Sequence, residues 1–213
     1  MDVAIAGGHG QVALRLERLL AAAGHRARGI IRNPDHAADL VEAGADPVVL
    51  DLEAAGVDEV AAAIAGADAV VFAAGAGPGS GAARKQTVDL GAATLLIDAC
   101  RAAGVDRYVM VSSIGAHAPE QATGAMGPYL AAKAAADEAL RASGLSWTIV
   151  RPGSLTDDPG TGRVTVSERM GGRGRVTRDD VAAVLSAVVG GRAVGKAFEL
   201  FEGDVPIDEA LRF

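Results

Sequence analysis

A tyrosine and a lysine that could act together on a proton lie in the middle of the chain. Tyr129 and Lys133 stand four residues apart in the segment YLAAK, so both side chains fall on one face of a helix. An ammonium group close to a phenol favours the phenolate form, which allows a tyrosine to give or take a proton near neutral pH. Ser112 and Ser113 end a strand-like run and would bring hydroxyl groups to the same sheet edge. The alternative is that Tyr129 only packs or makes a structural hydrogen bond.

A glycine-rich turn near the start of the sequence could hold a phosphate. Residues 7–13 read GGHGQVA, with the spacing G-x-x-G-x-x-A, between a strand-like and a helical run. Gly7 permits a tight turn, Gly10 lets the backbone approach a pyrophosphate, and Ala13 lets the helix pack closely on the sheet. Free N–H groups at the helix start then attract the anion. This context favours a dinucleotide site over a glycine turn without a ligand.

The end of the second strand-like run distinguishes between two dinucleotides. NAD sites usually place an acidic residue there to bind the ribose 2′-hydroxyl, but this chain has Arg32. A guanidinium suits a 2′-phosphate, so the sequence favours NADP(H) over NAD(H). The alternative is a solvated arginine paired with Asp35.

The elements that must position these residues follow from an alternation of short apolar runs and Ala/Leu-rich stretches. Continuous apolar strands separated by helices indicate a parallel sheet covered on both faces. We expect an α/β fold with a Rossmann-like, doubly wound parallel sheet of about seven strands, forming one NAD(P)-binding domain over residues 1–213 with a short substrate-side segment from about 154 to 213. The expected strands are 3–6, 27–31, 47–50, 69–73, 107–111, 147–150 and 197–201, and the expected helices are 11–23, 37–43, 57–65, 83–102, 127–142 and 177–189. Thr177 and Asp180 resemble a helix cap.

Composition excludes several classes of function. A net charge of −7 and only seven aromatic residues (one Trp, two Tyr, four Phe) argue against nucleic acid as a partner. Half of the residues are hydrophobic, which excludes general disorder, and no apolar run approaches the length of a membrane span. The single cysteine, Cys100, cannot form an internal disulfide. With no signal peptide, we expect a cytoplasmic protein that acts on a small molecule; the oligomeric state is not indicated.

A series of motifs resembles the atypical branch of the short-chain dehydrogenase/reductase superfamily. In order they are AGGHGQVA, IIRNPD, VVLDLE, VVFAAGAG, YVMVSSIGA, YLAAK, WTIVRPGSLTDDPGTG and RVTRDDVA. They cover nearly the whole chain and resemble the small NAD(P)H-binding proteins described as flavin or quinone reductases, sugar-epimerase-like proteins or NmrA-like proteins.

That resemblance implies roles for particular residues. Ser113 would orient a carbonyl or hydroxyl, Tyr129 would transfer a proton, and Lys133 would bind the nicotinamide ribose. The implied cofactor-binding residues are Gly7, His9, Gly10, Gln11 and Val12 at the pyrophosphate turn, Arg32 at the adenosine phosphate, Asp51 and Leu52 beside adenine, Ala73, Ala74 and Gly75 along the ribose, Lys133, and Pro152 and Gly153 over the nicotinamide amide. Residues 178–181 would help frame the substrate side.

Three features depart from the family pattern. His9 replaces a common Thr or Ser, and its ring would either touch phosphate or point to solvent. Ser113 precedes Tyr129 by sixteen residues, a spacing unlike that of either main branch. Atypical members also often leave the Tyr/Lys pair unused.

The other candidate residues indicate little chemistry. His25, His36 and His117 are scattered, so we expect no metal site, and no G-x-S-x-G turn supports a hydrolase. We expect Trp147 in the core and Cys100 as a small buried apolar residue. Lys85 and Asp89 are expected to pair on a helix surface.

These observations favour an NADP(H)-dependent oxidoreductase that passes hydride between nicotinamide and a small carbonyl, quinone or flavin. Two alternatives are a sugar-nucleotide epimerase or dehydratase, and a non-catalytic sensor of the NADP redox state. The acceptor pocket would be built from loops 75–84, 115–127 and 155–174.

Overall fold

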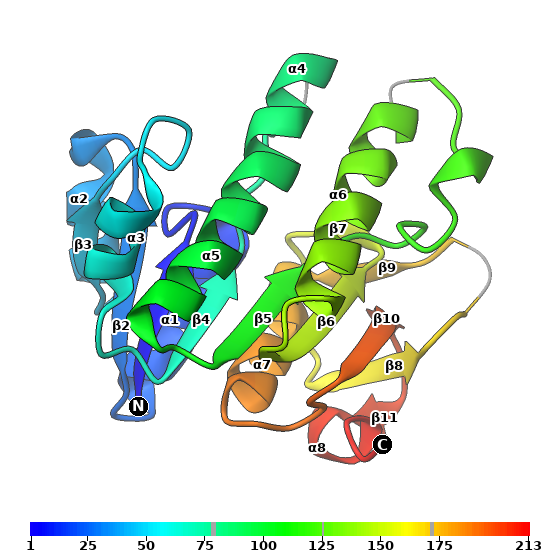
Figure 1. The fold of residues 1–213 in the computed structure, drawn as a ribbon. Coiled ribbons are helices and arrows are strands. Elements are labelled where there is room, and N and C mark those ends of the chain that lie inside the picture. Colours follow the sequence, from blue (N-terminus) through cyan, green and yellow to red (C-terminus); the bar gives the residue numbers. More distant parts are fainter. Residues whose placement is uncertain (78–79, 125, 171–172) are drawn as a thin grey trace.

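The computed structural model describes residues 1–77, 80–124, 126–170 and 173–213, and a nine-stranded sheet forms its centre (Figure 1). The strand order is β11-β8-β10-β6-β5-β4-β1-β2-β3. Seven strands form parallel pairs: β1 (Asp2–Ala6), β2 (Arg26–Ile31), β3 (Asp46–Val49), β4 (Ala69–Phe72), β5 (Arg107–Val111), β6 (Ser146–Pro152) and β10 (Lys196–Glu202). The seven predicted strands and the doubly wound order are therefore confirmed.

Two antiparallel strands, which the sequence did not predict, extend the sheet beyond β10. They are β8 (Arg163–Ser167) and β11 (Val205–Pro206). A separate two-stranded sheet contains β7 (Ser154–Thr156) and β9 (Arg175–Thr177). These strands are short and partly exposed, so they lack the continuous apolar runs that indicated the central strands.

Helices cover both faces of the sheet and form a hydrophobic core on each. One core receives side chains from α1 (Gln11–Ala22), α2 (Ala37–Glu42) and α7 (Arg178–Val189). The other receives them from α3 (Val57–Ile64), α5 (Ala93–Ala103) and α6 (Met126–Arg141), which lie on the near face in Figure 1. The central strand β4 is buried along its whole length, as a parallel strand covered on both sides must be.

The helix predicted at 83–102 is present but changes its winding along its length. It comprises α4 (Ala82–Arg84), a π-helical segment η2 (Lys85–Ala92) and α5, which together form one long rod (Figure 1). In a π segment each hydrogen bond spans five residues instead of the four of an α-helix, which changes which side chains face inward. Here it turns Asp89 into the protein interior.

The C-terminal part of the chain contains more elements than the predicted α7 and β10. It also supplies β7, β8, β9, β11 and the short helix α8 (Ile207–Ala210). The Thr177 hydroxyl accepts a hydrogen bond from the Asp180 N–H at 3.0 Å, so the predicted cap of α7 is confirmed. Residues 78–79, 125 and 171–172 of the expected acceptor loops lie outside the described residues. Across the described ranges, no helix is long and apolar enough to cross a bilayer.

Candidate functional site

A cleft of about 930 Å³ lies where the parallel strands end. It spans the point at which the strand order reverses, between β1 and β4, which is where open α/β sheets bind ligands. Every residue predicted above for cofactor binding or catalysis lines this cleft, together with Glu53, which the sequence did not single out, and with Arg84, Asp89 and Arg178. We call it the main cleft.

The glycine turn is fixed by close backbone packing. Gly7 has φ of +82°, and a Cβ on it would lie 2.7 Å from the Ala74 Cα. Its carbonyl accepts a hydrogen bond from the Gly10 N–H at 2.8 Å, and Gly10 begins α1 without a side-chain cap. The first N–H groups of α1 therefore face the cleft without a capping side chain, as an anion site requires.

A second glycine in the turn has a packing role that the spacing rule did not reveal. A Cβ on Gly8 would lie 2.7 Å from the Cα of Gly29 on β2 and 3.1 Å from the Glu17 carboxylate. The turn thus sits directly on the next strand. A glycine inside a strand often marks such a close approach. Gly29, inside the second predicted strand, was therefore the residue from which this contact could have been predicted.

Behind this turn, Glu17 of α1 is fully buried, and neither carboxylate oxygen has a hydrogen-bond partner. Burial raises the pKa of Glu17 to about 8, which the charge of Arg18 only partly opposes. The side chain is therefore largely protonated at neutral pH.

His9 is held beside the glycine turn by two side chains of the neighbouring helical segments. Its ring stacks on His36 with a centroid separation of 3.6 Å, and its Nε2 lies 2.7 Å from the Asp39 carboxylate. Its neighbour Gln11 accepts a hydrogen bond from Arg15. Both side chains still line the main cleft, and the contacts with His36 and Asp39 hold the His9 ring beside the glycine turn.

Arg32 lies at the end of β2 and pairs with Glu53 rather than with Asp35. Its Nη1 is 3.4 Å from Glu53 Oε2, and Arg84 reaches the same oxygen at 3.2 Å. Thr87 donates a hydrogen bond to the other Glu53 oxygen at 2.7 Å. Two guanidinium groups therefore converge on one carboxylate inside the cleft. From the sequence, Arg84 was expected only as the end of an acceptor loop, because this last residue of α4 has no fixed spacing from the glycine turn.

Lys133 is buried and held in place by a carboxylate. Its Nζ lies 3.2 Å from the Asp89 carboxylate and donates a hydrogen bond to the Val111 carbonyl at 3.2 Å. Asp89 is fully buried, which corrects the expectation that it pairs with Lys85 on a helix surface. Lys85 instead lies over the Tyr129 ring, 5.9 Å from its centroid. The π-helical winding of η2 explains why spacing alone predicted the wrong partner.

Ser113 and Tyr129 line the same wall of the cleft as Lys133. The Ser113 hydroxyl donates to the carbonyl of Ile114 at 3.3 Å. Among the described residues, no hydrogen bond joins the Tyr129 hydroxyl to Ser113 or Lys133. All three side chains therefore border one space, in which a small molecule could contact both hydroxyl groups.

The far wall is formed where β6 ends. A Cβ on Gly153 would collide with the Gly174 carbonyl and the Phe201 ring, so the backbone must pass close to both. Arg151, just before Pro152, binds the buried Asp137 of α6 through Nε and Nη2 at 3.0 and 2.9 Å. Burial raises the pKa of Asp137 although Arg151 opposes the shift. This pair joins the end of β6 to α6.

These features together define a Rossmann-like dinucleotide-binding protein. The model of the NAD(P)H-binding family matches residues 7–190, and the chain belongs to that family. It is 41% identical to the "Uncharacterized sugar epimerase YhfK" of Bacillus subtilis, over 100% of this chain and 99% of that protein.

Two solved structures resemble the whole chain. One, from Bacillus halodurans and provisionally assigned as an NAD-dependent epimerase/dehydratase, is 40% identical with a TM-score of 0.94, covering 99% of this chain and 98% of its own. The other, the oxidoreductase ylbE from Lactococcus lactis, is 27% identical with a TM-score of 0.84, covering 99% and 95%.

Proposed function

We propose that the protein is an NADP(H)-dependent oxidoreductase that transfers hydride between nicotinamide and a small carbonyl, quinone or flavin. The observation that carries this proposal is the shared cleft, which places the glycine turn at one end and Ser113, Tyr129 and Lys133 at the other. The residues present fit a dinucleotide, because a Cβ on Gly7 would fill the turn and the start of α1 has no side-chain cap.

The preference for NADP(H) over NAD(H) rests on Arg32 and Arg84. Both guanidinium groups contact Glu53, and a phosphate on the adenosine ribose would offer them a more highly charged partner. Glu53 also binds Thr87, so it can keep one partner when the arginines turn to the phosphate.

The proposed acid–base step uses Ser113, Tyr129 and Lys133, at the end of the main cleft away from the glycine turn. The bound dinucleotide supplies the hydride chemistry. Ser113 donates a hydrogen bond to the acceptor oxygen, and Tyr129 gives it a proton. Lys133, oriented by Asp89 and the Val111 carbonyl, binds the ribose and stabilises the phenolate that remains. A flavin or quinone acceptor needs less help from Tyr129.

The substrate-side segment, 154–213, contributes Leu155 and Arg178 to the main cleft. The described residues of this segment form only short strands and two helices, which supports a small acceptor or one that approaches from solvent. We propose the cytoplasm as the compartment, because the chain has a single, buried and free cysteine and so uses no internal disulfide.

The test compares NADPH oxidation by the wild type and Tyr129→Phe with a carbonyl and with a flavin acceptor. We expect the carbonyl rate to fall about 100-fold or more while the flavin rate stays within about twofold. Tyr108→Phe, which alters the other tyrosine, is the control, because the Tyr108 hydroxyl donates to Ala93 away from the cleft. Equal losses with both acceptors would contradict the proton-transfer role.

A second candidate, a sugar-nucleotide epimerase or dehydratase, is favoured by the names of YhfK and the Bacillus halodurans structure. Turnover of a nucleotide sugar without net NADPH oxidation would replace the proposed function with this one. Tight NADP binding without turnover of any acceptor would instead favour a sensor.

A further inference from the structure

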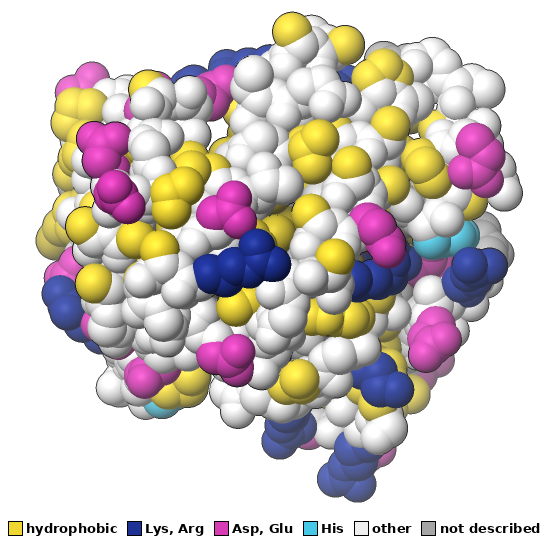
Figure 2. All heavy atoms as spheres, in the orientation of Figure 1, with side chains coloured by type: hydrophobic (Ala, Val, Ile, Leu, Met, Phe, Trp, Pro, Cys, Tyr) yellow, Lys and Arg dark blue, Asp and Glu magenta, His cyan; other side chains and the backbone are white. Residues whose placement is uncertain are grey.

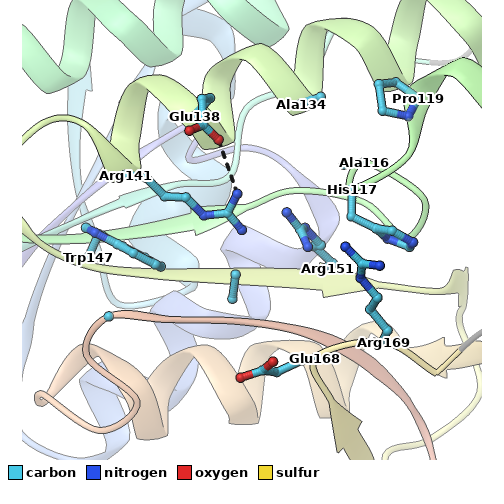
Figure 3. A pocket seen from close by; sticks show the side chains of 12 residues that line it. Ala116, His117, Pro119, Ala134, Glu138, Arg141, Trp147, Arg151, Glu168 and Arg169 are labelled. Atoms are coloured by element: carbon cyan, nitrogen blue, oxygen red, sulfur yellow. Dashed lines mark hydrogen bonds and ion pairs between the residues drawn. The ribbon is translucent and has the colours of Figure 1, made fainter.

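A second hollow, of about 570 Å³, lies beside α6 and the exposed ends of β6, β8 and β10 (Figure 3). Its lining residues are Ala116, His117, Pro119, Ala134, Glu138, Arg141, Trp147, Arg151, Glu168, Arg169, Gly195 and Ala197, and none of them lines the main cleft. We call it the outer cleft. In Figure 2, dark blue and cyan side chains meet beside α6 at the right of the molecule, although the chain as a whole carries a net charge of −7.

Three arginines from different elements point into the outer cleft (Figure 3). Arg151 of β6 is almost fully buried and uses Nε and Nη2 on Asp137, which leaves its other terminal nitrogen to the hollow. Arg141 extends from α6, and Arg169 follows β8. Among the described residues, the Arg169 guanidinium has no hydrogen-bond or ion-pair partner. This convergence leaves donors available for an anion.

Acidic groups pair with Arg141 and Arg151 but, among the described residues, not with Arg169. Glu138 pairs with Arg141 at 3.3 Å but is three-quarters exposed at the rim. Glu199 is buried and contacts His117 at 3.1 Å. The Glu168 carboxylate extends away from the guanidinium groups in Figure 3. An anion in the hollow would therefore meet Arg151 and Arg169 without displacing a partner from Arg169.

The end of the outer cleft away from Arg151 and Arg169 is suited to a flat ring (Figure 3). Trp147 lines it, with the Arg141 guanidinium 5.9 Å from its ring centroid. Its neighbours Ala134, Ala197 and Gly195 are small, and a Cβ on Gly195 would meet nothing within 4 Å. Trp147 packs against the hydrophobic core, as expected, but it is only partly buried. The part of the indole that is not buried is available to another ring.

We propose that the outer cleft binds a small aromatic anion, a planar ring that carries a phosphate or carboxylate. The ring stacks beside Trp147, and the anionic group accepts hydrogen bonds from Arg151 and Arg169. This site is separate from dinucleotide binding and does not depend on the reaction proposed above.

The test uses the fluorescence of Trp147, which is the only tryptophan in the chain. Phenyl phosphate is titrated into the protein saturated with NADPH, with inorganic phosphate and phenol as partial probes. We expect a saturable change with phenyl phosphate, and an affinity at least about tenfold higher than for either partial probe. Arg169→Gln should weaken phenyl phosphate binding about fivefold to tenfold.

Two matched arginine variants serve as controls. Arg18→Gln changes an exposed arginine on α1, and Arg32→Gln changes one in the main cleft; both should bind phenyl phosphate like the wild type. No saturable change, an equal affinity for inorganic phosphate, or an unchanged affinity in Arg169→Gln would overturn the proposal. Loss of the signal in Arg32→Gln would also overturn it, because the ligand would then occupy the main cleft.

Discussion

The two ends of the main cleft are built in different ways. At the nucleotide end, the backbone of residues 7–10 packs against Gly29 and Ala74, and few side chains are needed. At the other end, Lys133 depends on a carboxylate from η2 and a carbonyl from β5. The first end is defined by a short contiguous segment and the second by contacts between distant elements. Substitutions at the two ends should therefore have different effects on stability and on cofactor binding.

The largest effect is expected from Lys133→Met. It leaves Asp89 charged, buried and without its cation, which costs about 3–5 kcal/mol of unfolding free energy. Adding Asp89→Leu should recover much of this loss, because the uncompensated charge is removed. Urea unfolding measures both, with Lys196→Met as a surface control near Phe213. If the double variant is no more stable than the single one, the ion pair does not hold this end together.

A smaller but more local effect is expected from Gly7→Ala. The new methyl group would press on Ala74, and φ of +82° disfavours any residue but glycine. We expect NADPH binding to weaken about 100-fold, measured by equilibrium titration. Gly24→Ala is the matched control, since Gly24 has φ of +75° and open space around it. Similar NADPH affinities for the two variants would show that the turn does not bind the cofactor.

The buried carboxyl behind the turn predicts a pH effect. Because folding raises the pKa of Glu17 from 4.5 to about 8, the folded state holds a proton that the unfolded state releases over this range. Its contribution to stability is therefore complete below pH 4.5 and is lost as pH rises to about 8. Glu17→Gln cannot ionise, so at pH 8 it should be more stable than the wild type by on the order of 2 kcal/mol.

Thermal and urea unfolding across this pH range measure the difference, with the exposed Glu209→Gln as the control. The stability gap should widen with rising pH only for Glu17. A constant gap would mean that Glu17 is ionised in the folded protein.

The smallest effect is expected from the arginines at the nucleotide end, and it should differ between NADPH and NADH. Arg32→Gln should weaken NADPH binding about tenfold and leave NADH binding within about twofold, because only NADPH carries the 2′-phosphate. Arg84→Gln should act in the same direction, since both arginines contact Glu53. Equal losses for the two cofactors would show that neither guanidinium contacts the phosphate.

The difference between contiguous segments and contacts of distant elements also explains how much of the fold and site the sequence could predict. The seven parallel strands and the glycine turn follow from local apolar runs and spacing, so they were predictable. The partner of Lys133 was not, because a π-helical segment changes which residues face inward. The strand β8 was missed because its residues alternate between exposed and buried positions, and β11 because it is a two-residue edge strand. The outer cleft was missed because its arginines come from three separate parts of the chain.

Both outer strands of the nine-stranded sheet contain a proline, Pro47 in β3 and Pro206 in β11. Proline has no N–H group, so each outer strand offers one donor fewer to a passing strand of another molecule. Natural sheets use this device against edge-to-edge aggregation. Copies of this chain that associate would therefore be expected to meet through their helices rather than by extending the sheet.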